Sequence, residues 1–215
     1  MNPACTLILI RHGETLWNRE GRIQGHTDTD LAPEGRNQAG RVARYLARDG
    51  GSGAVIAAVV ASDLKRTRQT AEPIAQALRL DLSLEPGLRE RDFGEFQGLT
   101  HAQIEVRDPD GYARLSARDP GFAPRGGESL EGLRARVMAS IDRICERYAG
   151  STCVVVTHGG VLDIIRRRAT GMELSAKRDF VLPNAALNIV TCGPTGWRVR
   201  VWGKALGNGR SLDEL

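Results

Sequence analysis

The sequence has no apolar run long enough to cross a bilayer, and none of its four cysteines lies in a CxxC pair. A membrane-spanning helix needs about 20 consecutive apolar residues, and zinc or redox sites often contain such cysteine pairs. The N-terminus has neither the basic stretch nor the cleavage site of a signal peptide. We therefore expect a cytoplasmic protein that forms no disulfide, holds no metal and binds no membrane.

Aromatic residues make up only 5% of the chain, and its basic residues never cluster with them. The net charge of +4 therefore does not indicate nucleic-acid binding, and a mildly basic surface that attracts a small anion accounts for it at least as well. The sequence contains no Walker-type loop and no metal-ligand cluster, so we expect no cofactor. The 215 residues suit one domain over residues 1–206, followed by a frayed tail over 207–215.

Short apolar runs alternate with segments of helical spacing. The runs predict strands at 6–10, 54–61, 153–157, 189–191 and 197–202, and the spacing predicts helices from Pro33 to a stop at Gly50-Gly51, then at 64–78, 130–148 and 159–169. We expect Ser62 and Asp63 to cap the second helix, Pro73 to kink or end it, and Ser129 to cap the third. This alternation predicts an α/β fold with a mainly parallel sheet. The polar stretch 107–127 is expected to form a flap over one edge of the site.

Three predicted strands end in residues suited to phosphate chemistry. These ends are Arg11-His12-Gly13, Ser62 to Arg66, and His158-Gly159-Gly160. Ligands of open α/β sheets bind at the carboxyl ends of the strands. Arginine and histidine offer donors to a phosphate dianion, and the backbone N–H groups of a helix start, here at Gly159, also favour an anion. The sequence therefore predicts a phosphate pocket that includes Gly159.

His12 is the candidate nucleophile of this pocket. A neutral imidazole can attack phosphorus and form a phosphohistidine when a partner on its other ring nitrogen holds the tautomer. We expect that partner to be a nearby backbone carbonyl. Gly13 is expected to let the backbone come close to the phosphate.

Four separated segments resemble motifs of the histidine phosphatase superfamily, in the branch that contains the cofactor-dependent phosphoglycerate mutases: RHGETLWN, SDLKRTRQTA, LRERDFGEFQG and VVVTHGGVL. The match covers nearly the whole chain, in order. The resemblance implies a three-layer α/β/α fold. It also implies a phosphate pocket made of Arg11, His12, Arg66 and His158, in which His12 is phosphorylated.

The resemblance assigns further residues around that pocket. Asn18 matches another phosphate contact, and Glu90 matches the proton donor to the leaving oxygen. Gln24 and Gly25 lie where the family lines the substrate entrance. These matches imply that Asn18, Gln24 and Gly25 contact the substrate.

Phosphatases and mutases of this family share the pocket. The connection from the Glu90 motif to PRGGESLEGLRARV is short, which resembles the family's small-molecule phosphatases, whereas the mutases carry a longer insertion. We therefore interpret the chain as a metal-independent phosphomonoesterase that hydrolyses a small phosphorylated metabolite through a phosphohistidine. A cofactor-dependent phosphoglycerate mutase is the alternative, and a non-enzymatic phospho-ligand binding module is a third hypothesis. The sequence leaves open the substrate and whether the chain forms a homodimer.

Several other patterns are interpreted as structural. The segments Cys5–Arg11 and Cys192–Arg198 have the Cys-x5-Arg spacing of cysteine phosphatases, whose thiolate needs a phosphate-binding loop. The first is an apolar strand and the second runs into a strand, so neither provides that loop. We expect His26 and His101 at the surface or behind the site, and Arg166 to Arg168 only to complement a helix end.

Overall fold

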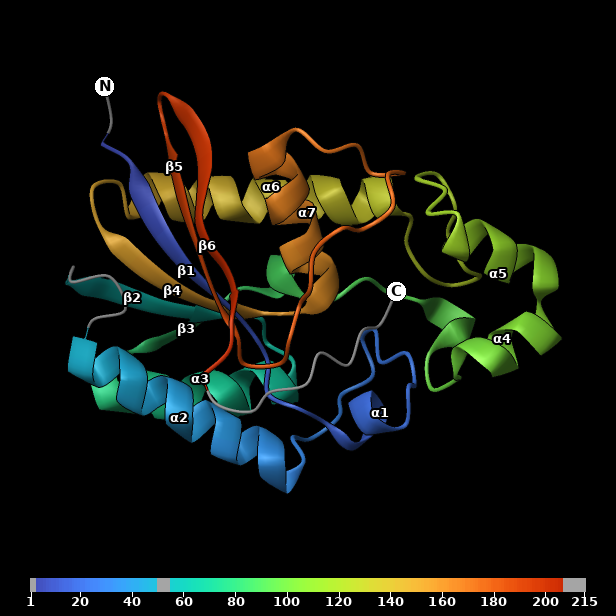
Figure 1. Ribbon diagram of the computed structural model, residues 1–215, viewed down its shortest axis with the longest axis horizontal. Helices are drawn as coiled ribbons and strands as arrows, with labels where there is room; N and C mark the ends of the chain where they lie inside the picture. Colours follow the sequence, from blue (N-terminus) through green and yellow to red (C-terminus); the bar gives the residue numbers. More distant parts are fainter. Residues whose placement is uncertain (1–2, 50–54, 207–215) are drawn as a thin grey trace.

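The computed structural model describes residues 3–49 and 55–206, and its centre is a six-stranded sheet (Figure 1). The strands are β1 (Cys5–Arg11), β2 (Ile56–Ala61), β3 (Leu82–Leu84), β4 (Thr152–Thr157), β5 (Leu187–Gly193) and β6 (Gly196–Lys204). Their order is β3-β2-β4-β1-β5-β6. The first four are mutually parallel, whereas β5 and β6 pair antiparallel. The predicted α/β class with a mainly parallel sheet is confirmed.

Helices cover both faces of this sheet. The pair α2 (Pro33–Asp49) and α3 (Lys65–Leu78) packs on one face, and the pair α6 (Leu130–Arg147) and α7 (Gly159–Thr170) packs on the other (Figure 1). Along β1 the side chains alternate, because Leu7 and Leu9 join the cluster with α6 and α7, whereas Ile8 and Ile10 join the cluster with α2 and α3. The result is the three-layer α/β/α sandwich, with β1 buried at its centre.

Local sequence explains some helix starts but not all. The Ser129 hydroxyl accepts a hydrogen bond from the Gly132 N–H and caps α6, as predicted. The predicted cap of α3 is wrong, because its N-cap residue is Leu64, whose side chain makes no capping bond. The first N–H of α3, on Lys65, instead donates to Asp28 Oδ1 at 2.6 Å. Asp28, from a distant loop, therefore accepts the hydrogen bond that was predicted for Ser62 and Asp63.

Pro73 does not end its helix, since α3 continues to Leu78 as one element. Three further expectations lie outside the described residues: the stop at Gly50-Gly51, the start of the second strand at residue 54, and the tail over 207–215. The shorter turns α1 (Leu16–Arg19), η1 (Pro86–Leu88) and η2 (Gly94–Phe96) lie in the connections.

The stretch 107–127 borders a cavity beside Glu90 through Leu115, Ser116 and Arg118, as expected for a flap, but it is less polar than expected. It contains helix α5 (Pro109–Ser116), which follows α4 (His101–Arg107). Two of its side chains, Leu115 and Phe122, form an apolar cluster with Ile23, Phe96 and Ile104 from outside the stretch. Two of its residues start this helix: the Asp108 carboxylate caps α5 through the Gly111 N–H, and Pro109 occupies the first helical position. Residues 117–127 form turns and irregular segments.

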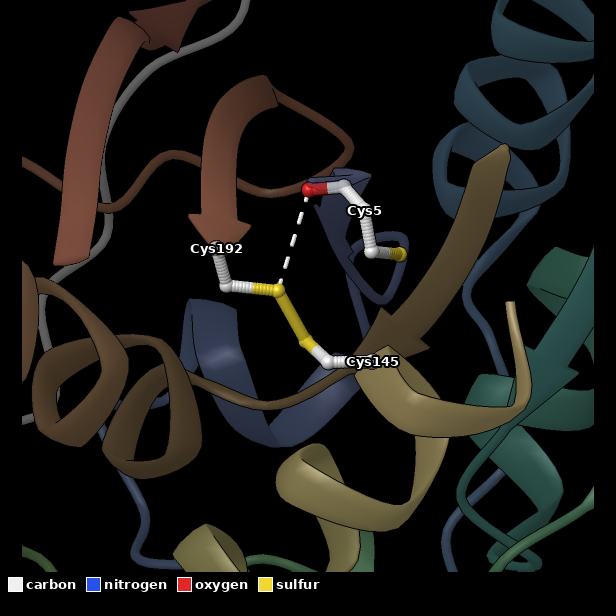
Figure 2. The surroundings of a disulfide bond; sticks show 3 residues. All are labelled: Cys5, Cys145 and Cys192. Carbon is white, nitrogen blue, oxygen red and sulfur yellow. Dashed lines mark hydrogen bonds between the residues drawn. A yellow bond between two sulfur atoms is a disulfide. The ribbon is translucent and has the colours of Figure 1, made fainter. Parts of the chain in front are cut away.

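Cys145 and Cys192 form a disulfide that ties α6 to β5, so the prediction of no disulfide is wrong (Figure 2). The two cysteines are 47 residues apart and meet only because α6 packs against the sheet. The Cys5 sulfur lies within 4.8 Å of both disulfide sulfurs. Because the disulfide uses two of these three sulfurs, the group is unsuited to a metal. The bond also removes the reason to expect a reducing compartment.

The two remaining cysteines are buried thiols. Burial raises the pKa of Cys5 to about 11 and that of Cys153 to about 12, so both stay protonated near neutral pH. Among the helices in the described ranges, none combines the length and the apolar character needed to cross a membrane.

Candidate active site

The three predicted strand ends meet at one edge of the sheet. Arg11 is the last residue of β1, Ser62 directly follows β2, and His158 directly follows β4. Because β4 pairs with both β1 and β2, these ends lie side by side. The ring centroids of His12 and His158 are 5.3 Å apart. The structure therefore brings together residues from three separated motifs.

His12 is buried and held in one tautomer. Its Nδ1 atom lies 2.8 Å from the carbonyl oxygen of Gly13. A carbonyl oxygen only accepts hydrogen bonds, so Nδ1 carries the proton and the lone pair is on Nε2. Burial, and then the guanidinium groups of Arg66 and Arg11, lower the pKa of His12 well below its ordinary value of 6.5. The imidazole is therefore neutral at pH 7 and nucleophilic at Nε2.

His158 faces Ser62 across the strand ends. Its Nε2 atom lies 2.9 Å from Ser62 Oγ. Burial, followed by the charge of Arg66, lowers the pKa of His158 well below 6.5. Its Nδ1 atom has no hydrogen-bond partner among the described residues. Ser62 was assigned only a capping role from the sequence, although its place at a strand end is the signal that identified the other residues.

Two buried arginines surround the histidines and are anchored by backbone carbonyls. Arg11 Nη1 donates to the Leu182 oxygen at 2.6 Å. Arg66 donates from Nη1 to the Thr27 oxygen at 2.9 Å and from Nη2 to the Gly25 oxygen at 2.7 Å. Carbonyl acceptors orient a guanidinium without neutralising its charge. These bonds fix the direction of both guanidinium groups at the strand ends.

Glu90 is held at the start of α7. The Gly160 N–H donates to its two carboxylate oxygens at 3.1 and 3.0 Å, and the Arg91 N–H donates to Oε1 at 2.8 Å. The Glu90 carbonyl oxygen lies 2.8 Å from His26 Nε2 and accepts from Arg136 Nη2 at 3.1 Å. His26 therefore lies behind the site, as expected. The main chain and the side chain of Glu90 are both fixed.

Two glycines permit this close packing. A Cβ atom on Gly160 would lie 2.2 Å from Glu90 Oε1, so Gly160 is the residue that lets the carboxylate reach the helix start, a role that the sequence did not reveal. A Cβ atom on Gly13 would lie 2.5 Å from the Gly35 oxygen. The close approach seen at Gly13 is thus to the start of α2, whereas the sequence suggested an approach to phosphate.

Asn18 and Gln24 are buried and engaged in hydrogen bonds to the protein. Asn18 Oδ1 accepts from the Thr15 N–H at 3.0 Å and from Asn184 Nδ2 at 3.3 Å. Gln24 Oε1 accepts from the hydroxyls of Thr15 and Thr29 at 3.0 and 2.7 Å. Substrate contact by either side chain stays a prediction.

Gly25 and Asn184 position neighbours of the histidines. Gly25 has a φ of +52°, and its carbonyl accepts from Arg66, so this turn anchors a pocket arginine. Asn184 Nδ2 donates to the His12 carbonyl oxygen at 2.9 Å. No motif pointed to Asn184, because it lies 172 residues from His12 along the chain.

A cavity of about 290 Å³ opens beside Glu90 and Gly159. Six apolar side chains line it: Ile23, Phe93, Leu115, Leu130, Leu133 and Phe180. His101 lies in the same wall, closer to the site than expected from the sequence. Glu90 and Gly159 connect this cavity to the strand ends that hold the histidines.

Basic residues gather around one buried carboxylate in this wall. Asp163 Oδ2 accepts from Arg167 Nε at 2.8 Å and from Arg118 Nη2 at 2.6 Å, and Oδ1 accepts from Arg178 Nε at 3.2 Å. Burial on its own would raise the pKa of Asp163, but the hydrogen bond from Arg167 and the neighbouring guanidinium charges lower it. The interpretation of Arg167 as a mere helix-end cation is therefore wrong.

The cysteine-phosphatase interpretations fail in the structure as well. Cys5 lies inside strand β1, and Cys192 is bonded to Cys145. Neither sulfur sits in a loop that could cradle phosphate.

Comparison with known proteins agrees with this geometry. The chain is 38% identical over 200 residues to "Phosphoglycerate mutase-like protein 4" of Arabidopsis thaliana, covering 92% of this chain and 84% of that protein. It is 37% identical to "Metal-independent phosphoserine phosphatase" of the same plant, covering 91% and 80% of the two chains. A solved mycobacterial glucosyl-3-phosphoglycerate phosphatase, Rv2419c with VO3, has a TM-score of 0.78 and 30% identity, covering 93% and 99%.

The family assignment rests on the full length of the described fold. A family model for the histidine phosphatase superfamily (branch 1) matches residues 7–205, from β1 to beyond β6. The motifs, the sandwich and the relatives agree on the phosphoglycerate mutase-like branch. The chain therefore belongs to the histidine phosphatase superfamily.

Proposed function

We propose that this protein hydrolyses small phosphomonoesters through a phosphohistidine on His12. One observation carries the proposal: a neutral His12 with its lone pair on Nε2 lies among Arg11, Arg66 and His158. Positive charge around a phosphoryl group and an in-line nucleophile are what phosphoryl transfer needs. Glu90 lies at the helix start beside the same residues.

In the first step, His12 Nε2 attacks phosphorus and the bond from phosphorus to the leaving oxygen breaks. Glu90 gives its proton to that oxygen, so the product leaves as a neutral alcohol. Arg11 and Arg66 stabilise the charge on the equatorial oxygens. Their carbonyl anchors hold the donors in place before the substrate arrives.

In the second step, water attacks the phosphorus of phospho-His12. The Glu90 carboxylate takes a proton from that water, the bond to Nε2 breaks, and inorganic phosphate leaves. Glu90 is thereby protonated again and His12 is neutral again. Because guanidinium groups supply the charge, we expect full turnover in EDTA, and recovery of a lost activity by added Mg²⁺ would contradict this mechanism.

A rapid acid quench with labelled substrate tests the intermediate. Label should be trapped on His12, with the acid lability and base stability of a phosphoramidate. His12→Ala should abolish trapping and turnover, whereas His26→Ala is the matched control that should still be labelled at His12. Label on another residue, or turnover by His12→Ala, would reject the proposal. The same assay with p-nitrophenyl phosphate excludes a binding module that has no activity.

Phosphoglycerate mutation is the second candidate, and a relative named for phosphoglycerate mutase favours it. Relatives named as phosphatases favour hydrolysis. The two reactions differ in whether water or a second hydroxyl accepts the phosphoryl group. We expect phosphate release from 3-phosphoglycerate, with little 2-phosphoglycerate formed when 2,3-bisphosphoglycerate is added. Faster interconversion than phosphate release would favour the mutase instead.

A further inference from the structure

Three of the four cysteines gather at the end of the sheet that lies away from the histidines. Cys5 begins β1, Cys192 lies directly opposite it on β5, and Cys145 lies in the last turn of α6. Their sulfur atoms all lie within 4.8 Å of one another (Figure 2). The fourth cysteine, Cys153, lies outside this group. The fold therefore brings three sulfur atoms to a place where a disulfide needs only two.

Regular elements hold the three sulfurs in place. Cys5 and Cys192 are buried in the apolar cluster between the sheet and the α6–α7 layer, and Cys145 packs against that cluster. Side chains on helices and strands are positioned more precisely than side chains on loops. Packing of α6 on the sheet thus keeps the three sulfurs together, whether or not two of them are bonded.

The distances suit a bound metal ion. In a tetrahedral zinc site with Zn–S bonds of about 2.3 Å, the sulfurs lie about 3.8 Å apart, so the Cys5 sulfur needs to move by no more than about 1 Å. The Cα atoms of Cys145 and Cys192 are 6.8 Å apart, at the upper end of the range found for disulfides. Once the bond is open, their sulfurs can separate with little movement of the backbone.

A second cavity, also of about 290 Å³, opens at these sulfurs. Cys145 and Cys192 line it together with Asp142 and Glu146, and none of the described residues that line it is basic. Asp142 and Cys145 are three residues apart on α6 and so share one face of the helix. A cation therefore has a path to the sulfurs, with negative charge along that path.

We propose that Cys5, Cys145 and Cys192 form a zinc site when the disulfide is reduced. A dithiol reductant gives two electrons and two protons to the Cys145–Cys192 bond, which yields two thiols, and the dithiol itself becomes a disulfide. Zn²⁺ then binds the three sulfurs, and the displaced thiol protons pass to solvent. Three sulfurs leave a fourth position of the ion, which water from the second cavity fills.

The nature of the ligands selects the ion, and their positions define its role. Thiolates favour soft cations such as zinc, whereas Mg²⁺ and Ca²⁺ favour oxygen ligands. The bound ion joins α6 to β1 and β5, as the disulfide joins α6 to β5 in the oxidised protein. The fold thus keeps a cross-link at this place in both redox states. The site is structural and does not depend on the proposed phosphatase function.

A cobalt titration tests the site, because Co²⁺ can replace Zn²⁺ and its bonds to thiolates absorb light. The protein is reduced with a phosphine, which adds no competing thiol, and the phosphine is removed under nitrogen. A thiol assay in denaturant should then count all four cysteines. Reduced protein should bind one Co²⁺ per chain with thiolate absorption, and one equivalent of Zn²⁺ should abolish that absorption. Absence of this absorption, or its presence in the oxidised protein, would overturn the proposal.

Two variants assign the ligands. Cys5→Ala should weaken Zn²⁺ binding by the reduced protein at least about 100-fold, since even loss of a residue behind a metal ligand costs roughly 10- to 100-fold. Cys153→Ala is the matched control, because it removes another buried thiol, on the neighbouring strand β4, and should leave the affinity unchanged. The intact disulfide of oxidised Cys5→Ala allows its folding to be checked by circular dichroism. Equal affinities of the two variants would refute the three-sulfur site.

Thermal unfolding measures the cross-link itself. Zn²⁺ should raise the Tm of the reduced protein, because an ion that binds only the folded chain stabilises it. The increase should be absent in the oxidised protein and much smaller in reduced Cys5→Ala. A reduced chain that is unfolded both with and without Zn²⁺ would contradict the proposal, because packing of α6 on the sheet is what assembles the site.

Discussion

The phosphate end of the site and the cavity beside Glu90 both contain arginines, but they anchor them differently. Arg11 and Arg66 donate to backbone carbonyls, which fix the direction of each guanidinium. Arg118 and Arg178 donate to the carboxylate of Asp163 on α7. The first arrangement holds donors in place at the strand ends, where the proposed mechanism needs them. The second joins separate segments of the cavity wall to α7 through one buried carboxylate.

The largest effect should come from removing the shared carboxylate. Asp163→Ala leaves three buried guanidinium groups without their anion, and loss of one partner of a buried ion pair typically costs about 3–5 kcal/mol of folding stability. Urea unfolding measures this as a lower midpoint. Asp142→Ala, at an exposed position of α6, is the control and should shift stability by less than about 0.5 kcal/mol. Similar midpoints for the two variants would show that Asp163 balances no buried charge.

A change at the phosphate end should instead affect every substrate alike. Arg66→Ala removes a preorganised donor, so kcat/KM should fall about 100-fold or more for p-nitrophenyl phosphate and for 3-phosphoglycerate alike. Arg66→Lys keeps the charge but replaces the planar fork, whose Nη1 and Nη2 atoms reach the Thr27 and Gly25 carbonyls, with one nitrogen atom, so it should recover only part of the loss. Circular dichroism checks that both variants fold. A loss restricted to one of the two substrates would place Arg66 outside the shared phosphate pocket.

The difference between the phosphate end and the cavity beside Glu90 also explains how much of the site could be predicted from the sequence. His12, Arg66 and His158 were found because they follow or adjoin strands, and the ends of parallel strands converge at one edge. Asp163 and Arg167 show only an i, i+4 pair on a helix, a pattern that surface helices also contain. Their burial depends on how Arg118 and Arg178 approach from separate segments. Such tertiary packing leaves no local signal.

Other differences between the predictions and the structure also arise where local sequence does not reveal tertiary packing. Cys145 and Cys192 are joined by packing of α6 on the sheet, so their spacing was uninformative. Helix α5 in the 107–127 stretch was missed because Asp and Pro residues favour both loops and helix starts. Pro73 was expected to kink or end α3, but it does not end the helix, which is held by burial of Ile74 and Ala75 against the sheet and α2. Local propensity is overridden where an apolar face is buried.

Removal of the disulfide should affect neither the phosphate end of the site nor the cavity beside Glu90. Cys5, beside the bond, and Arg11, at the site, lie at opposite ends of β1, which spans roughly 20 Å at 3.3 Å per residue. Replacing both Cys145 and Cys192 by alanine should lower stability by about 2–4 kcal/mol, because the bond closes a long loop, while kcat/KM for p-nitrophenyl phosphate stays the same. Thermal unfolding and the p-nitrophenyl phosphate assay measure the two quantities. A changed kcat/KM would mean that α6 transmits strain to the cavity wall.

The smallest effect is on pH dependence, and it belongs to the phosphate end alone. The pKa values of His12 and His158 lie well below 6.5 in the folded protein because both rings are buried near Arg66, whereas in the unfolded chain they return to about 6.5. Between these values the unfolded chain binds more protons than the folded one. The free energy of unfolding should therefore fall as the pH drops below 6.5, by up to about 1.4 kcal/mol per pH unit for each histidine.

Urea unfolding at several pH values from 7.5 to about 5.5 measures that slope. His158→Gln removes one of the two groups, so its slope should be smaller than that of the unaltered protein by up to about 1.4 kcal/mol per pH unit. His26→Gln, outside the pocket, should leave the slope closer to that of the unaltered protein. The neutral form of His12 should also keep the nucleophile active below pH 6.5, so kcat, which reports groups in the enzyme–substrate complex and not ionisation of the free phosphate ester, should show no limb at that pH. A limb in kcat at 6.5, together with an unchanged slope in His158→Gln, would mean that both rings titrate near their ordinary pKa in the folded protein, and it would contradict the neutral nucleophile assigned to His12.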